Sequence, residues 1–153
     1  MTDELPDHIP AWQRRIAEAH ARHPIVRRPR LRQRFAAFAS ARPEDHILDV
    51  LTGPGYNAFA FARRTKHVTA VDSRRHLLEM ARRQMEKRRL HNVAITRADP
   101  TDLPVPDASF EIVTSAAAVH HFAAPQQAVA EMVRVCAPGG KVVIEAMVAS
   151  EQV

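Results

Sequence analysis

Two aspartates and two glycines in the first half of the chain have the spacing of a nucleoside-binding site. Asp49 lies in the apolar run 46–50, and Gly53 and Gly55 follow that run in a short loop. Glycine lets the backbone approach a ligand closely and adopt positive φ angles. Asp72 ends the next apolar run, where a carboxylate can accept two hydrogen bonds from ribose hydroxyls. The pattern predicts a site for an adenosyl cofactor, and nucleotide-binding enzymes of several kinds share it.

Candidate groups for proton transfer lie in the second half of the chain. His120 and His121 follow the fourth apolar run, and histidine titrates near neutral pH, so either could act as a general base. The alternative role for such a pair is a polar loop or a helix cap. Tyr56 follows the glycine loop directly, where it either lines a substrate pocket or only opens the next helix.

From residue 46 onward, short apolar runs alternate with amphipathic stretches, which is typical of β-α-β units and a parallel sheet. Strands are predicted at 46–50, 67–71, 93–96, 110–114 and 141–146. Helices are predicted at 57–64 and 125–135. A third helix is predicted to begin after Ser73, which can act as its N-cap. The inner face of the last helix is predicted to carry Ala128, Val129, Met132 and Val133.

The first 43 residues have a different character. They hold two predicted helices, 11–22 and 31–41, separated by prolines that break the helical pattern. We therefore expect an N-terminal helical arm or lid at 1–43 and a core domain at 44–153.

Composition limits the classes of function. The net charge is +5, and the arginines concentrate in 1–42 and 73–90. Such faces attract anionic substrates or nucleic acid, or are simply solvated helix faces. Without zinc-ligand spacing or interleaved aromatic residues, nucleic acid is not the expected partner. One cysteine, no secretory signal and no membrane-spanning apolar run lead us to expect a cytoplasmic protein.

Several segments occur in the order found in class I S-adenosylmethionine (SAM)-dependent methyltransferases. Residues 47–55 resemble the first motif of this family, commonly Asp-x-Gly-x-Gly-x-Gly, and 68–72 resemble its ribose-binding segment. Residues 98–113 are similar to the adenine-binding loop and the fourth strand of the family. Residues 119–122 and 134–140 match two later landmarks in the same order. The resemblance covers about 44–147 and is strongest to the small-molecule branch that includes ubiquinone and menaquinone C-methyltransferases.

The resemblance implies an α/β fold, a Rossmann-like sandwich with a mostly parallel sheet of about five strands, and SAM-dependent methylation of a small-molecule acceptor. Asp49 would face the methionine amino group of SAM, and Gly53 and Gly55 would pass beneath the cofactor. Asp72 would bind the ribose, and Asp99 the adenine amino group. The other implied cofactor-binding positions are Leu51, Ser73, Pro100 and Ser115. No metal is implied.

Two residues depart from the family pattern. Leu51 stands where the family has glycine or alanine, and its side chain could fill space meant for the methionine tail. Pro100 stands where the family often has alanine, and proline has no N–H to donate, so one hydrogen bond of about 0.5–1.5 kcal/mol would be missing. An alternative function is therefore a catalytically inactive methyltransferase-like protein that acts as a dimerising or regulatory binding partner.

Members of the family usually continue beyond the fifth strand with a helix and an antiparallel hairpin. Without these elements the strand at 141–148 would be an exposed edge, and such edges recruit other chains. We expect a homodimer or a heteromer formed through this edge or through the N-terminal helices. The alternative is a fragment or a truncated gene product.

Overall fold

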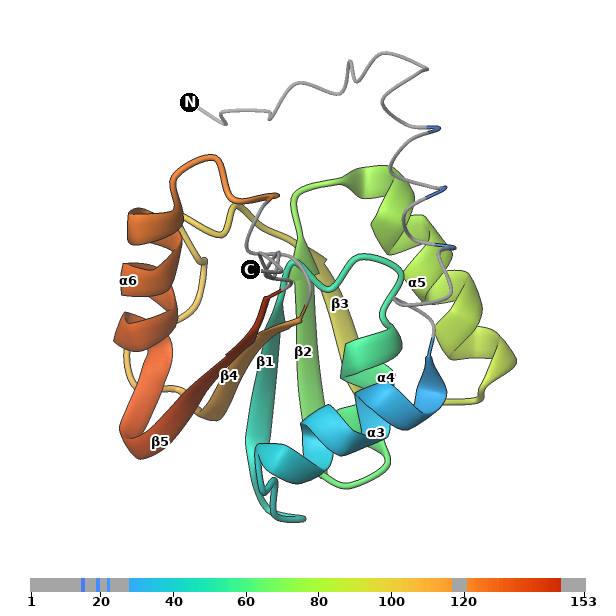
Figure 1. Ribbon diagram of the computed structural model, residues 1–153, viewed down its shortest axis with the longest axis horizontal. Helices are drawn as coiled ribbons and strands as arrows, with labels where there is room; N and C mark the ends of the chain where they lie inside the picture. The colour runs from blue at the N-terminus through green and yellow to red at the C-terminus, as the bar shows by residue number, and fades with distance from the viewer. Residues whose placement is uncertain (1–14, 16–18, 20–21, 23–27, 117–120, 147–153) are drawn as a thin grey trace, which may run out of the picture.

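A sheet of five parallel strands forms the centre of the molecule, in the order β3-β2-β1-β4-β5 (Figure 1). Its strands are β1 (His46–Val50), β2 (His67–Asp72), β3 (Val93–Arg97), β4 (Phe110–Ala116) and β5 (Cys136–Glu145). The computed structural model describes residues 15, 19, 22, 28–116 and 121–146. The strand order and the parallel pairing confirm the predicted Rossmann-like α/β fold.

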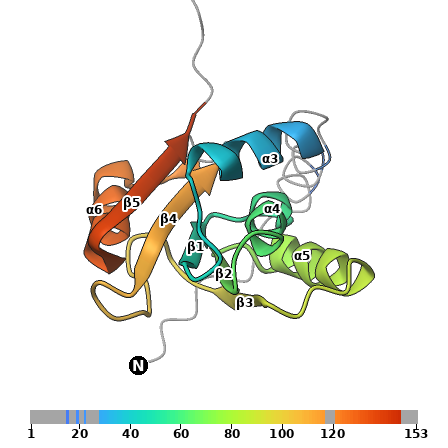
Figure 2. The ribbon, with the colours of Figure 1, turned by 90° about the horizontal axis from the view of Figure 1, so that it is seen from below.

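Helices cover both faces of the sheet (Figure 2). They are α3 (Pro29–Phe38), α4 (Tyr56–Ala62), α5 (Arg75–Lys87) and α6 (Pro125–Val135). Alternate residues of β1 show why two layers form, because Ile47 belongs to the core cluster beneath α3 and α4, while Leu48 belongs to the cluster beneath α6. None of the helices in the described part of the chain is long and apolar enough to cross a membrane.

The buried face of α6 differs from the prediction at two of the four residues, because Val129 is only partly buried and Val133 is exposed. Ala128 and Met132 are buried as predicted, but Val133 is 59% exposed, and Val135 is fully buried instead. These three buried residues follow the i, i+4, i+7 stripe of a helix, whereas Val133 lies about 100° around the helix from Met132. A valine next to the stripe fits the apolar pattern without facing the core.

Helix α3 packs on the core rather than standing apart from it. It begins at Pro29, a position in the first turn where the missing N–H costs nothing. Phe35 is buried, and its ring meets that of Phe61 edge-on, with centroids 6.2 Å apart. The predicted helix at 11–22 lies almost entirely outside the described residues. The division into an arm at 1–43 and a core at 44–153 therefore stays a prediction.

Strand β5 begins earlier than predicted and lies at one side of the sheet. It starts at Cys136, directly after α6, and the register against β4 shifts between Phe110 and Ile112. Gly139 and Gly140, predicted to separate helix from strand, lie within this irregular first part of the strand. Among the described residues, β5 pairs with β4 alone, so its outer side is an edge.

Candidate cofactor-binding site

Asp49 lies at the carboxyl end of β1 and is 1% exposed. Its Oδ2 accepts a hydrogen bond of 2.6 Å from the Thr52 hydroxyl in the following loop. Its Oδ1 accepts bonds of 2.7 Å from Asn57 Nδ2 and 2.8 Å from the Thr114 hydroxyl. Because Asn57 belongs to α4 and Thr114 to β4, one carboxylate joins two strands, the loop and a helix at the carboxyl edge of the sheet.

The environment of Asp49 favours a cationic ligand. Burial raises the pKa of this carboxyl group, and hydrogen bonds from Thr52, Asn57 and Thr114, together with the positive charge of Arg32, act in the opposite direction. The dominance of burial means that the negative charge is poorly solvated where it stands. A positively charged group brought to this edge would therefore gain a strong electrostatic interaction.

Two buried polar atoms near the carboxyl edge of the sheet, Asn57 Oδ1 and Ser115 Oγ, have no hydrogen-bond partner among the described residues. A carboxylate only accepts hydrogen bonds, so Asn57 must direct its NH₂ group at Asp49, which leaves its own oxygen unused. Ser115 lies near the end of β4 and is fully buried. Each unsatisfied buried group costs about 1–3 kcal/mol, so a polar ligand at this edge would be stabilised by meeting them.

The two loop glycines have different physical roles. Both have positive φ angles, +56° at Gly53 and +88° at Gly55. A Cβ atom at Gly55 would lie 2.5 Å from the ring of Phe59, so packing against α4 excludes a side chain there. A Cβ atom at Gly53 would meet no described atom within 4 Å, so the loop is open at that point. The N–H of Gly53 donates to Asp72 Oδ2 at 2.9 Å, which ties this loop to the end of β2.

Leu51 keeps the backbone conformation expected of glycine while using its side chain in the core. Its φ is +54°, a left-handed conformation that costs a non-glycine residue of order 1–3 kcal/mol. The residue is 7% exposed and belongs to the core cluster on the α6 side of the sheet. Burial of the leucine side chain, worth about 1.5–3 kcal/mol, offsets the strained backbone.

Asp72 ends β2 with its side chain fully buried, and its carboxylate accepts four hydrogen bonds. Gly53 N–H and Arg74 Nη2 bind Oδ2, each at 2.9 Å. The backbone N–H and the Nε of Arg74 bind Oδ1, also each at 2.9 Å. Arg74 rather than Ser73 is the residue at the N-cap of α5, and it makes no side-chain cap bond. Ser73 instead accepts a bond of 3.0 Å from Arg97 Nε at its carbonyl oxygen.

Asp99 and Pro100 lie in a turn that follows β3. Asp99 Oδ1 accepts bonds from the Thr101 N–H at 2.8 Å and the Thr101 hydroxyl at 2.7 Å. The Asp99 carbonyl accepts from the Asp102 N–H at 3.1 Å. The residue therefore forms the turn through one carboxylate oxygen and presents Oδ2 for other interactions. Pro100 is partly buried and offers no N–H.

Arg32, which lies in α3 and is 4% exposed, is a residue of this region that the sequence patterns do not single out. Its Nη2 donates to both carboxylate oxygens of Glu145, at 2.7 and 3.1 Å, and its Nε has no hydrogen-bond partner within the described part of the chain. Its positive charge acts on the pKa of Asp49, so the guanidinium lies near the site. Arg32 is one of several arginines in a basic stretch, and no spacing signal distinguishes it from its neighbours.

Of the candidate bases, His120 lies outside the described residues, and His121 is exposed. Neither is placed against the Asp49 cluster by a described contact. Their role as general bases stays a prediction.

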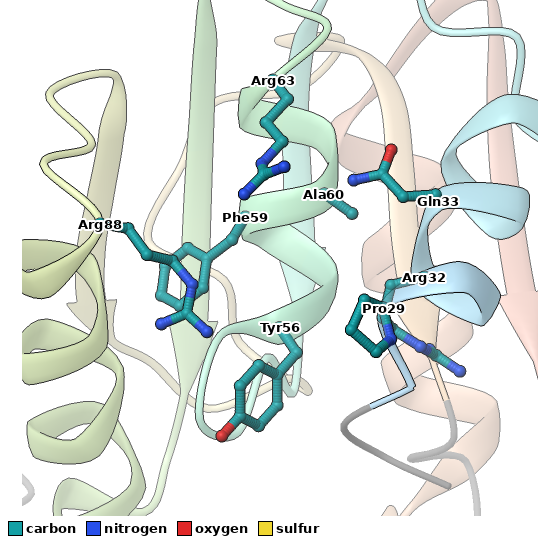
Figure 3. A pocket seen from close by; sticks show the side chains of 8 residues that line it. All are labelled: Pro29, Arg32, Gln33, Tyr56, Phe59, Ala60, Arg63 and Arg88. Carbon is teal, nitrogen blue, oxygen red and sulfur yellow. The ribbon is translucent and has the colours of Figure 1, made fainter.

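A hollow of about 350 Å³ lies on the outer side of α4, between α3 and α5. Figure 3 shows the guanidinium groups of Arg63 and Arg88 near the ring of Phe59, with Tyr56 below them. Arg88 lies 5.6 Å from the ring centroid of Tyr56 and 5.3 Å from that of Phe59. Tyr56 thus opens α4 and also lines a hollow. Helical periodicity places this stripe on another side of α4 from Asn57, whereas Arg32 lines the hollow as well as lying near the Asp49 cluster.

Several of the curated proteins similar to this chain are named as methyltransferases. A curated relative, the uncharacterized methyltransferase YcgJ of Bacillus subtilis, is 33% identical over 103 residues, which cover 67% of this chain and 41% of the relative. The demethylmenaquinone methyltransferase of Thermus thermophilus is 37% identical over 117 residues, which cover 75% of this chain and 53% of the relative. The chain thus spans about half the length of these relatives.

Solved structures agree with the sequence comparison. The crystal structure of YcgJ superposes with a TM-score of 0.72 at 30% identity, covering 74% of this chain and 48% of that one. The [4+2]-cyclase SpnF gives a TM-score of 0.71 at 27% identity, covering 75% of this chain and 43% of the cyclase. The second name shows that the fold can accompany a different reaction.

The family comparison covers the site described above. The methyltransferase domain family matches residues 48–144, which extend from β1 to the end of β5 and include Asp49, the glycine loop, Asp72, Asp99 and Ser115. The match extends over more than half of the chain. The chain therefore belongs to the class I SAM-dependent methyltransferases through its methyltransferase domain.

Proposed function

We propose that this chain binds SAM at the carboxyl edge of its sheet and serves in the transfer of a methyl group to a small-molecule acceptor. The observation that carries the proposal is the pair of buried carboxylates, Asp49 and Asp72, at the ends of neighbouring strands β1 and β2. The glycine loop lies between them and is tied to Asp72 through Gly53. The unsatisfied Ser115 Oγ and Asn57 Oδ1 support the presence of a polar ligand at the same edge.

The residues present fit the parts of SAM. Asp49 would hold the ammonium group of the methionine portion of SAM. The carboxylate of that methionine portion would meet Arg32, a nearby cation whose Nε is not used by a described residue. Asp72 would bind the ribose, and Asp99 Oδ2 would accept from the adenine amino group. Pro100 would contribute apolar contact only, because it has no N–H.

When bound, SAM supplies a methyl group made electrophilic by the sulfonium. The task of the protein is then mainly to hold the acceptor in line with that methyl group, a form of catalysis by orientation. The named quinone methyltransferase among the relatives supports a small acceptor. His120 or His121 would remove a proton where the acceptor carries one.

Isothermal titration with SAM and with its demethylated product, S-adenosylhomocysteine, tests the proposal. We expect the wild-type chain to bind both ligands saturably. We expect Asp72→Ala to lower the affinity for both by at least about tenfold, because it removes the carboxylate that would accept hydrogen bonds from the two ribose hydroxyls. Asp102→Ala is the matched control, because Asp102 is an exposed acid on the same edge whose side chain is not assigned to the site. Absence of binding to the wild-type chain would reject the proposal and favour the inactive, partner-binding alternative.

A further inference from the structure

The side chain of Arg74 covers the carboxylate that the proposed function assigns to the ribose. Its Nε and Nη2 each lie 2.9 Å from a different oxygen of Asp72, in the paired geometry of a guanidinium on a carboxylate. The Asp72 side chain is fully buried, whereas that of Arg74 is 23% exposed. The arginine therefore lies between the buried acid and the solvent.

The hydrogen-bond capacity of Asp72 is filled by these contacts. An ionised carboxylate offers about four lone-pair positions. The backbone N–H groups of Gly53 and Arg74 take two of them, one on each oxygen. The guanidinium of Arg74 takes the other two, again one on each oxygen. A ribose diol also offers two hydroxyl donors, so the guanidinium occupies the same number of positions that the diol requires.

We propose that Arg74 is a displaceable substitute for the ribose diol, so that SAM must remove its side chain from Asp72 in order to bind. The inference rests on the proposed function of the site. It makes Arg74 a residue that sets affinity and selectivity, because a ligand without a diol cannot compensate Asp72 for the lost guanidinium.

The surroundings of Arg74 allow this exchange without rearranging the sheet. Asp72 stays in place during the exchange, because its two backbone donors do not depend on the Arg74 side chain. Arg74 is the N-cap residue of α5 and makes no side-chain cap bond that would hold it against the helix. Its released guanidinium can move into water, since it is already partly exposed.

Titration of Arg74→Ala and Arg74→Met with SAM and S-adenosylhomocysteine tests the inference. We expect both variants to bind both ligands about tenfold more tightly than the wild-type chain, because the diol no longer competes with a charge-assisted pair. Arg74→Met keeps the apolar stem, which guards against loss of folding. Thermal melting gives an independent readout: the variants should melt lower than wild type without ligand but show a larger upward shift with saturating SAM.

Arg83→Ala is the matched control, because Arg83 is an exposed arginine of the same helix, away from Asp72. Its affinity for SAM should equal that of the wild type. A pair of simpler probes isolates the diol: Arg74→Ala should improve binding of adenosine but not of 2′,3′-dideoxyadenosine.

The outcomes separate this inference from the proposed function. Equal or weaker SAM binding by both folded Arg74 variants, with binding by wild type retained, overturns the role of Arg74 and leaves the proposed function standing. Loss of SAM binding in wild type and in both variants overturns both. Binding by the variants but not by wild type would mean that SAM cannot displace the guanidinium, which overturns both.

Discussion

At the scale of single residues, Asp49 is a buried acid whose ionisation destabilises the folded protein, and neighbouring hydrogen-bond donors reduce that effect. Asp49 is held by three side chains from three parts of the fold, yet burial still raises its pKa. In the unfolded chain this carboxyl loses its proton near the ordinary value of 3.8, and in the folded chain only at higher pH. As the pH rises above the ordinary value, ionisation of this group therefore favours the unfolded state.

We therefore predict that Asp49→Asn stabilises the free protein at pH 7 while weakening SAM binding. The asparagine removes the buried charge, and we expect a melting temperature higher by about 2–4 °C, as a change of about 1 kcal/mol produces in a domain of this size. The difference should vanish below the ordinary pKa of aspartate, where both side chains are neutral. Melting curves from pH 3 to pH 8 measure this, and parallel curves for the two proteins would contradict the prediction.

At the scale of elements, local periodicity was sufficient to predict most of the fold. Most of the predicted strands and helices from residue 29 onward lie within three residues of the observed ones, because alternation and helical spacing are properties of adjacent residues. Strand β5, which begins five residues early, is the exception. The positions of Asp49 and Asp72 followed from strand ends for the same reason. Val133 was wrongly predicted to face the core, because an apolar pattern does not determine the rotation of a helix about its axis to better than one residue position.

The contacts of the site were less accessible to sequence reasoning. Arg74 reaches Asp72 only because the chain turns sharply between β2 and α5, and nothing in the spacing shows where a long side chain goes. Asn57 and Thr114 meet at Asp49 through the order of strands, 57 residues apart in sequence. Such long-range contacts depend on topology, which a local pattern does not contain.

The loop that precedes β4 depends on α6 through Arg134. This side chain donates to both oxygens of Glu131, to Asp107, and to the carbonyl oxygens of Leu103 and Val105. Glu131 in turn accepts from the Leu103 N–H at 2.8 Å. The pair therefore holds the segment that follows Asp99 against the helix.

We predict that Glu131→Gln lowers the melting temperature by about 1–3 °C at pH 7, consistent with a partly exposed ion pair. The hydrogen bond from Arg134 is the main cause of a lowered pKa at Glu131. A lowered folded-state pKa stabilises the protein fully above the ordinary value of 4.5, and this contribution is lost as the pH falls through the lowered value. The gap between wild type and variant should therefore close in acid, and a gap that widens would contradict the assignment.

At the scale of the whole molecule, the outer side of β5 is the surface at which we propose a second copy of this chain. Unpaired edges offer a row of backbone donors and acceptors to another strand. Ile144, 38% exposed near the end of β5, adds apolar surface there. Small-angle scattering at micromolar concentration should give about twice the 17.1 kDa mass of the chain, and a monodisperse monomer would reject the proposal.

The ion pair between Arg32 and Glu145 joins α3 to the end of β5 across 113 positions of the sequence. At about 5–20 residues per second, a ribosome takes roughly 6–23 seconds to add those residues. During that interval the arginine that becomes buried in the finished protein has no acid from β5 to meet. Helix α3 can therefore form this ion pair only late in synthesis, after the end of β5 has been made, although its packing on α4 requires only residues made much earlier.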